Sequence, residues 1–279
     1  MRRLIYMLFA AALMTGCRMD KGEEFEPTRL GYDLTRCTSD VLWSMSDEVI
    51  TLLHFSDYIK ADGEERERLH DKWFYTSRIV EREDGAWSII NSNSELKIFT
   101  NGKTLDEADA EWEFYSGNAT HTDGDVPTIS HTGTDSNGSE QYTLHFPGHK
   151  YALYTSVRPA NYRNYYGDVK VTVMPYEIIT GGEKDDGTAC IFDGVFTFYV
   201  SPYSFGTEYC CATVLSPVEY RPAERDIRSG RLALAIDVDG NVKSPEVEFL
   251  GGSKVKVFGG KDNAYSRTYD LNSYYYYYE

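Results

Sequence analysis

The sequence alternates apolar and polar residues over short stretches, and Asn-Gly or Asp-Gly pairs separate several of them. The clearest stretch spaces Leu232, Leu234, Ile236 and Val238 two residues apart and ends at Asp239-Gly240. Because successive side chains of a β-strand point to opposite faces, this spacing predicts a strand with one apolar face. The Asn-Gly and Asp-Gly pairs favour the tight turns of β-hairpins. We therefore expect consecutive antiparallel strands.

The same pattern recurs from about residue 74 to the end of the chain. Alternating residues occur in these groups: Leu96 and Ile98; Trp112 and Phe114; Tyr142, Leu144 and Phe146; Val169, Val171 and Val173; Val195, Thr197 and Tyr199; Val247 and Phe249; Val255 and Val257. Further turns are predicted at Asp84-Gly85, Asn101-Gly102, Asn137-Gly138 and Asp186-Gly187. The spacing predicts roughly ten to fourteen strands in an antiparallel meander. Since open sheets rarely exceed about ten strands, the expected fold over 74–279 is mainly β. It forms a two-layer sandwich or a curled sheet, as one domain or two subdomains.

A helical segment over 38–73 precedes the strands. Thr38 or Ser39 can cap a helix that runs to about residue 60. Its apolar residues recur at helical spacing on one face: Val41, Met45, Val49, Leu52 and Ile59. Ala61-Asp62-Gly63 then breaks the helix, and a shorter one follows up to Trp73. We expect these helices to pack on the sheet, because the apolar stripe needs a partner.

The N-terminus has the organisation of a secretory signal peptide over residues 1–16. Arg2 and Arg3 precede an apolar stretch that is too short to cross a bilayer, and small residues lead to Cys17. The segment L-M-T-G-C resembles the lipobox of bacterial lipoproteins, although Met14 departs mildly from the usual Leu. The resemblance implies that Cys17 is lipidated, with palmitate among its acyl chains, and begins the mature chain.

The residues after Cys17 predict a flexible tether over 17–37. The run RMDKGEEFEP is charged and contains glycine and proline, so it has little to bury. Its acidic patch resembles the export signal of surface lipoproteins in Bacteroidota. The resemblance implies anchoring to the outer membrane through lipid, on either its surface or its periplasmic side.

Charge argues against one class of partner. The chain has 44 Asp and Glu against 28 Lys and Arg, a formal net charge of -16, and loss of Arg2 and Arg3 with the leader would change it to -18. Such a surface repels phosphate backbones, so no nucleic acid partner is expected. The sequence also has no P-loop, dinucleotide or G-x-S-x-G motif. We expect no cofactor and no catalytic residue.

Four cysteines remain after Cys17, and the predicted compartment permits disulfides. Cys210 and Cys211 are adjacent, so in a strand they point to opposite faces and should not bond each other. A bridge between Cys190 and one of them, with Cys210 as the first choice, is one interpretation. Buried free thiols are the other.

Two groups of residues have the spacing of metal ligands. Asp237, Asp239, Asn241 and Glu248 occupy positions 1, 3, 5 and 12 of a calcium-loop pattern, but the required glycine is Val242. A hairpin turn with spare carboxylates explains the same residues. The histidines His121, His131, His145 and His149 have no helical ligand context, so loop histidines on a polar surface are the simpler interpretation, and no metal is expected.

An aromatic segment, SVRPANYRNYYGD, is the strongest candidate for ligand binding. Tyr162, Tyr165 and Tyr166 would offer flat faces to sugar rings, with Arg158 and Arg163 as forked donors, on a loop between two valine-rich runs. The alternative is that tyrosine simply fills the sheet, because the chain has 23 tyrosines. The final LNSYYYYYE predicts a last strand, a strand edge or a tail that pairs with a partner.

Three classes of function follow. The first is a cell-envelope lipoprotein that acts as a non-catalytic binding or accessory module, with a glycan or an envelope protein as ligand. The second is a structural or adhesive surface component, which the C-terminal tyrosines favour. The third is a glycan hydrolase, which requires two carboxylates at catalytic separation that the sequence alone does not single out.

Overall fold

The computed structural model describes residues 29–92, 94–116, 126–146, 150–155, 158–180, 183–200, 208–238, 241–259 and 265–271. Two helices come first, α2 (Arg29–Lys60) and α3 (Gly63–Trp73). The strands follow in this order: β1 (Arg78–Glu81), β2 (Trp87–Asn91), β3 (Ser94–Phe99), β4 (Ala110–Ser116), β5 (Thr128–Thr134), β6 (Glu140–Phe146), β7 (Lys150–Thr155), β8 (Arg158–Thr180), β9 (Glu183–Val200), β10 (Glu208–Arg221), β11 (Asp226–Val238), β12 (Asn241–Lys243), β13 (Glu246–Gly251), β14 (Lys254–Gly259) and β15 (Tyr265–Asp270).

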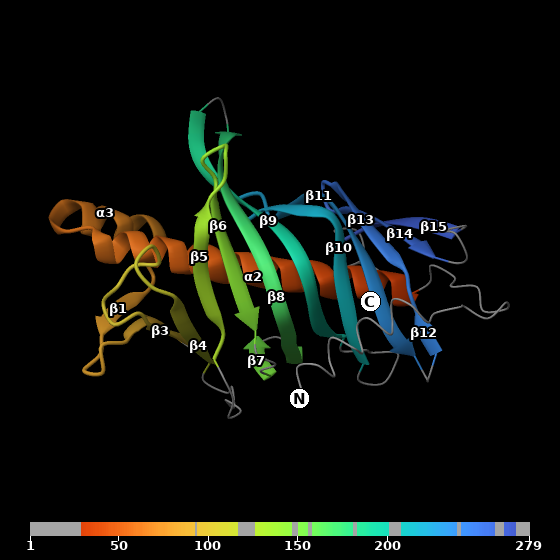
Figure 1. The fold of residues 1–279 in the computed structure, drawn as a ribbon, viewed down its shortest axis with the longest axis horizontal. Helices are drawn as coiled ribbons and strands as arrows, with labels where there is room; N and C mark the ends of the chain where they lie inside the picture. Colours follow the sequence, from red (N-terminus) through yellow and green to blue (C-terminus); the bar gives the residue numbers. More distant parts are fainter. Residues whose placement is uncertain are drawn as a thin grey trace.

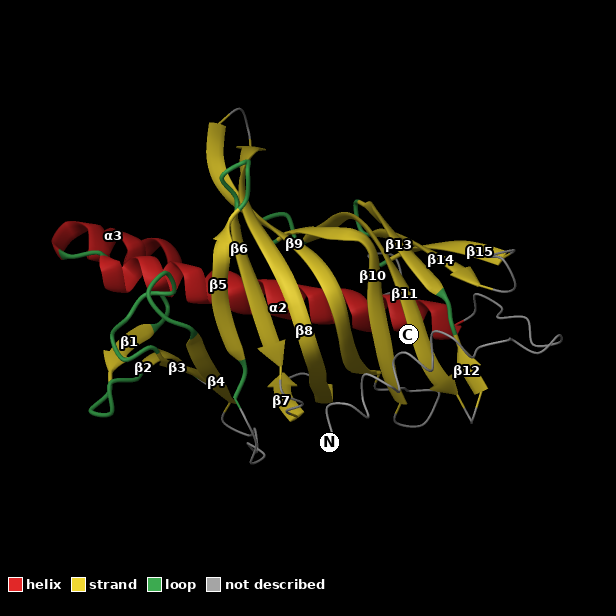
Figure 2. Ribbon diagram, viewed as in Figure 1, coloured by secondary structure: helices red, strands yellow, loops and turns green. Residues whose placement is uncertain are grey.

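The strands form one antiparallel sheet of mainly sequential neighbours. Among the described residues the sheet is 15-stranded, with order β1-β2-β3-β4-β5-β6-β8-β9-β10-β11-β13-β14-β15, while β7 pairs with β8 and β12 pairs with β11. Figures 1 and 2 show that the sheet twists and curls over α2, which crosses the strands on one face. The prediction of a mainly β meander with a helix packed on it is confirmed, and the curled sheet is the alternative observed.

Alternation along the strands creates the core between the sheet and α2. Leu232, Leu234 and Ile236 are at most 2% exposed and belong to the same buried cluster as the apolar face of α2. Trp112 of β4 is fully buried, and its Nε1 donates a hydrogen bond of 3.0 Å to Glu48 Oε2 on α2. Because burial of one large apolar side chain contributes about 1.5–3 kcal/mol, the helix stripe and the strand stripes stabilise each other.

Glycines inside long strands allow the sheet to curl. Gly194 in β9 and Gly230 in β11 have φ of +121° and +127°, a conformation that L side chains rarely adopt. A Cβ atom added to Gly230 would lie 2.5 Å from Val218 Cα of β10. The β10–β11 register also shifts near this point, between Ser216 and Glu219. Glycine bends and bulges of this kind turn a flat sheet into a curved one.

The helix α2 begins earlier than the sequence predicted. The tether was expected to reach residue 37 and Thr38 or Ser39 to cap the helix, but α2 starts at Arg29. The Oγ1 of Thr38 donates to the carbonyl of Leu34 at 2.7 Å, and Ser39 Oγ donates to the carbonyl of Thr35 at 2.8 Å. Both hydroxyls therefore bond back within the helix instead of capping it. The burial of Leu34 explains the extension, since it continues the apolar face of the helix.

The turn predictions were partly right. Asn101 and Gly102 both have positive φ, +49° and +75°, as expected for a turn of the Asn-Gly type. Asp186-Gly187, in contrast, lies inside β9 and pairs with β8, where Gly187 is opposite Tyr176. A Cβ atom on Gly187 would lie 2.6 Å from the Tyr176 ring. This glycine accommodates an aromatic ring across the ladder, and the prediction of a turn there is wrong.

Candidate functional site

A cleft of about 320 Å³ opens between the first half of α2 and the C-terminal strands. In Figure 1, α2 passes from β11–β14 at one end to β1–β4 at the other. The cleft lies at the first of these ends, so it combines residues from near both ends of the described chain. Its lining residues come from α2 and from strands β10, β11, β13 and β14 with their turns: Ser39, Asp40, Trp43, Tyr220, Arg225, Asp226, Ile227, Phe249, Ser253, Lys254, Val255 and Leu271.

The strand ladder places the floor of the cleft. Tyr220 pairs with Ile227 across β10 and β11, and Phe249 pairs with Val255 across β13 and β14. Phe249 and Val255 are 3% and 1% exposed. Because side chains alternate between the two faces of the sheet, the apolar ones on this face form the floor of the cleft. The turns that join the strands supply the polar edges.

Asp226 joins two of these turns. The backbone N–H of Ser253, in the turn between β13 and β14, donates to Asp226 Oδ1 at 3.2 Å. The second carboxylate oxygen, Oδ2, lies 3.3 Å from Arg228 Nε. Because Asp226 is only 8% exposed, this pairing offsets the cost of burying its charge. Asp226 is thus a fixed part of the cleft wall.

The rim of the cleft carries an aromatic ring and charges of both signs. Trp43 is 38% exposed although it is a large apolar side chain. Asp40 precedes it by one helical turn, and Arg225 and Lys254 line the strand side. Within the described part of the chain, the side chains of Arg225 and Lys254 take part in no ion pair or hydrogen bond. An apolar floor with a few convergent polar groups is typical of ligand sites, whose volumes are commonly 300–1,000 Å³.

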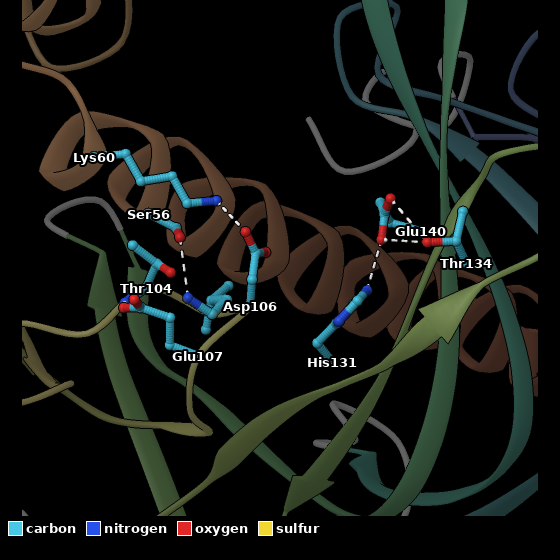
Figure 3. Close-up of polar contacts among 9 residues, drawn as sticks. Ser56, Lys60, Thr104, Asp106, Glu107, His131, Thr134 and Glu140 are labelled. Atoms are coloured by element: carbon cyan, nitrogen blue, oxygen red, sulfur yellow. Dashed lines mark hydrogen bonds and ion pairs between the residues drawn. The ribbon is translucent and has the colours of Figure 1, made fainter.

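A second group of polar contacts lies at the other end of α2 (Figure 3). Lys60 pairs with Asp106 in the connection between β3 and β4, and Ser56 Oγ accepts a hydrogen bond of 3.1 Å from the Leu105 N–H. Burial is the main cause that raises the pKa of the neighbouring Asp57 carboxyl. These contacts fasten the end of the helix to the loop, so we interpret them as structural.

A histidine-carboxylate pair lies on the strands near that end of the helix. His131 Nε2 and Glu140 Oε2 are 2.6 Å apart, and Thr134 Oγ1 donates to the same carboxylate at 3.2 Å (Figure 3). The His131 ring also packs against Tyr142, with 5.2 Å between ring centroids. Burial, followed by the charge of Glu140, raises the pKa of the Tyr142 hydroxyl well above its usual range. The pair holds β5 to β6 and borders no described cavity.

The aromatic segment is a strand in the structure and not a loop. Residues 158–166 belong to β8, where Tyr162 pairs with Ala152 of β7, and Tyr165 and Tyr166 pair with Phe198 and Thr197 of β9. Arg163 pairs with Tyr151, and Arg158 pairs with Thr155. The prediction of a loop is wrong because β8 continues through the segment as a 23-residue strand. Neither β7 nor β8 borders the cleft, so ligand binding at these tyrosines stays a prediction.

Two of the proposed calcium ligands, Asp237 and Glu248, lie far apart in the sheet. Val238 pairs with Asn241, and Asp237 pairs with Val242, so these residues belong to the β11–β12 hairpin. Asp239 lies outside the described residues. Glu248 pairs instead with Arg231, six positions from Asp237 along β11, which corresponds to roughly 20 Å. The described residues contain no group of three or more His, Cys, Asp or Glu that could hold a metal ion.

The four described cysteines form no disulfide with one another. Cys37, Cys190, Cys210 and Cys211 are all free. Cys190 pairs with Tyr220 in the β9–β10 ladder, whereas Cys210 pairs with Phe198, eight positions further along β9. This separation is roughly 26 Å along the strand, but a disulfide needs Cα atoms within about 7 Å. The predicted Cys190–Cys210 bridge is therefore wrong, and the alternative of buried thiols holds for both residues.

Of the four histidines considered as possible metal ligands, the structure describes His131 and His145, and these two lie on opposite faces of the sheet. His131 pairs with Tyr142, and His145 is three positions from Tyr142, so the two rings project from opposite faces. His145 Nδ1 bonds Asp168 Oδ1 at 2.6 Å on the exposed face. His121, His149, Cys17 and the C-terminal tyrosines lie outside the described residues. In the part of the chain that the structure describes, no helix is both long and apolar enough to span a membrane.

Sequence reasoning missed the residues of the cleft. One signal was available, since Trp43 falls outside the apolar stripe of Val41, Met45 and Val49 on α2. A tryptophan on the polar side of an amphipathic helix needs an explanation. Arg225 and Lys254, which line the same cleft, are separated from Trp43 by most of the chain, and no local pattern points to them.

Comparison with known proteins identified no relative. No family model matches the chain, and neither the curated proteins nor the solved structures that were searched contain a match. The site must therefore be interpreted from its own geometry.

Proposed function

We propose that this protein is a lipid-anchored lipoprotein of the bacterial cell envelope that binds a saccharide without catalysis. The cleft between α2 and the C-terminal strands is the proposed binding site. The observation that carries the proposal is the exposed Trp43 indole at the rim of a 320 Å³ cleft with an apolar floor and charged edges.

The chemistry of the cleft suits a sugar ring. A sugar has an apolar face of C–H groups and an edge of hydroxyls. The indole of Trp43 offers a flat face for the first, and Asp40 offers acceptors for the second. Arg225 and Lys254 offer donors on the opposite side. The volume suits one or two sugar rings, because ligand pockets begin at roughly 300 Å³.

The state of Asp226 favours binding over hydrolysis. A hydrolase needs one carboxylic acid that is able to protonate a leaving group and a second carboxylate on the other side of the scissile bond. Asp226 Oδ1 already accepts a hydrogen bond from the Ser253 N–H, and Oδ2 forms an ion pair with Arg228. Its role is therefore to hold the cleft together, which leaves Asp40 as the one carboxylate on the helix side of the lining.

Lipid on Cys17 would keep the cleft close to the membrane. Arg29, where α2 starts, is twelve positions after Cys17, a length that spans about 40 Å when the chain is extended. The cleft lies within the next four turns of the helix, at Ser39, Asp40 and Trp43. Such an arrangement would capture envelope or extracellular glycans near the surface that carries the anchor.

A thermal-shift screen with a matched pair of tryptophan variants tests the proposal. The mature chain, with or without Trp43→Ala, is heated in the presence of a panel of neutral and acidic oligosaccharides and peptidoglycan fragments. Trp73→Ala is the control, because Trp73 is 39% exposed but lies on α3, at the far end of the molecule. A ligand at about 100 times its dissociation constant should add roughly 2.7 kcal/mol of stability.

The expected result is a shift with at least one saccharide that disappears in Trp43→Ala and persists in Trp73→Ala. A panel without any shift would count against saccharide binding and would direct attention to protein partners and the structural role. A shift that survives Trp43→Ala would place the site elsewhere, with Tyr162, Tyr165 and Tyr166 as the next positions to change.

A further inference from the structure

Several basic side chains in the described residues form ion pairs with acidic ones. Arg221 binds Glu219, Arg228 binds Glu224 and Asp226, and Arg231 binds Glu246. The overall charge of the chain is strongly negative, with 44 acidic residues against 28 basic ones. The cleft nevertheless contains two cations that form no ion pair within the described residues, Arg225 and Lys254.

The neighbouring acidic groups do not neutralise these cations directly. Asp226 is held by Arg228 and by the Ser253 amide. Glu224 pairs with Arg221 and Arg228. Asp270 is opposite Lys254 in the β14–β15 ladder, but Lys254 forms no ion pair with any described residue. Asp40 remains on the helix side of the cleft. The strand side thus presents positive charge on a protein whose overall charge is strongly negative.

The backbone holds both edges of this wall in an uncommon conformation. Arg225 and Ser253 have φ of +51° and +62°, and Asn101 is the only other non-glycine residue with positive φ in the described part of the chain. The N–H of Arg225 donates to the carbonyl of Pro222 at 3.0 Å, which closes the turn before β11. Residues in such conformations concentrate at ligand sites, where the surrounding structure holds them in place.

We infer that the cleft selects saccharides that carry an anionic group, either a carboxylate or a sulfate. The forked guanidinium of Arg225 donates hydrogen bonds to the two oxygens of such a group, and Lys254 adds a second positive charge. Trp43 covers the apolar face of the same sugar ring. This inference rests on the proposed function, since it names the class of sugar that the same site takes.

Binding measurements with matched sugar pairs test the inference. Isothermal titration of the mature chain compares an oligosaccharide of uronic acids with its carboxyl-reduced form, and a sulfated oligosaccharide with its desulfated form. The proteins are the wild type, Arg225→Gln, Lys254→Gln and a control, Lys170→Gln, whose exposed side chain lies on β8 away from the cleft. The carboxylate and sulfate arms distinguish the two sources of negative charge.

We expect the anionic member of at least one pair to bind about tenfold or more tightly than its neutral counterpart, as a charge-assisted hydrogen bond allows. Arg225→Gln should remove most of this preference, Lys254→Gln part of it and Lys170→Gln none. Added salt should weaken binding of the anionic sugar only, because the cleft is open to solvent.

The failure of this inference differs from the failure of the proposed function. If neutral and anionic sugars bind equally and both need Trp43, the cleft binds saccharides and the anionic preference is overturned. If no sugar binds, both proposals fall. Should Arg225→Gln not fold, as circular dichroism would reveal, the wild-type sugar pairs and Lys254→Gln still decide the question.

Discussion

The N–H of Ser253 donates a hydrogen bond of 3.2 Å to Asp226 Oδ1, and this contact joins the turn after β13 to the first residue of β11. The two residues are 27 positions apart in the chain. Because Arg225 precedes Asp226 and Lys254 follows Ser253, the contact also fixes the separation of the two cations of the cleft. The geometry of the candidate site therefore depends on one buried carboxylate.

Replacement of Asp226 by alanine should destabilise the protein and open the cleft. The Ser253 N–H would lose its acceptor, at a cost of about 1–3 kcal/mol, while Arg228 would keep its ion pair with Glu224. Asp226→Asn keeps one acceptor oxygen and should cost less. Urea unfolding followed by circular dichroism measures both variants, and equal stability of Asp226→Ala and the wild type would contradict the role given to this carboxylate.

Loss of the Glu48 carboxylate should weaken the contact between α2 and β4. The buried indole N–H of Trp112 donates to Glu48 Oε2 at 3.0 Å, so Glu48→Leu leaves the donor unsatisfied. We expect a loss of about 1–3 kcal/mol in the free energy of unfolding. Glu48→Gln retains an acceptor and serves as the control, and a leucine variant as stable as the glutamine variant would show that the hydrogen bond is dispensable.

Alanine substitutions at two glycines with similar backbone conformations should distinguish the destabilising effect of steric crowding from that of backbone strain. Gly230 and Gly133 have φ of +127° and +134°, but only Gly230 has neighbours within 4 Å of an added Cβ, the closest being Val218 Cα at 2.5 Å. Gly133→Ala should cost about 1–3 kcal/mol through strain. Gly230→Ala should cost about 1–3 kcal/mol more, because the clash is with backbone. Similar midpoints in urea for the two variants would mean that β10 and β11 approach less closely than described.

The protein should lose stability between about pH 6.5 and pH 4, in part through His54. Burial and, secondarily, the charge of Lys72 lower the pKa of His54 from 6.5 to about 4, while its ring stacks on Trp73 with 3.7 Å between centroids. The unfolded chain therefore binds a proton in this window that the folded protein excludes, so stability falls as the pH falls. The contribution is at most about 3 kcal/mol.

Comparison with His54→Gln isolates this contribution from that of the carboxylates. The free energy of unfolding is measured in urea at pH 7, 5.5 and 4 for both proteins. The variant should show a shallower decline with falling pH. Parallel declines would indicate that the ring is accessible to protons in the folded state.

Cys190 and Cys210 should resist alkylation in the folded protein. Both side chains are fully buried, and burial raises the pKa of Cys190 to about 12 and that of Cys210 as well. Because the thiolate is the reactive form, iodoacetamide should modify them only after unfolding. Mass spectrometry under non-reducing conditions checks the result, and a Cys190–Cys210 crosslink in the native protein would contradict the strand register.

Local pattern was sufficient to predict the strands and most of the helix. The alternation of Leu232, Leu234 and Ile236 marks a buried strand face because it needs only the two-residue period of the β conformation. Asn101-Gly102 marks a turn because both residues tolerate positive φ. The apolar stripe of Val41, Met45 and Val49 also depends only on local geometry. Residues four positions apart lie on one face of a helix, so their spacing predicts the helix without any long-range contact.

Other features depend on contacts between distant segments. Asp186-Gly187 has the composition of a turn, but the ring of Tyr176 across the ladder requires a glycine at this position. Leu34 extends α2 through residues with the composition of a tether because the sheet buries it. In each case tertiary packing overrides a local preference that amounts to about 1 kcal/mol or less.

The candidate site depends entirely on such contacts between distant segments. Trp43 and Asp40 come from the first helix, whereas Arg225, Asp226 and Lys254 come from turns near the other end of the chain. Each is an ordinary polar or aromatic residue in its local sequence, so nothing in the spacing marks it. They share a cleft because the meander carries the C-terminal strands over the first half of α2. That proximity arises from the curl of the whole sheet around its helix.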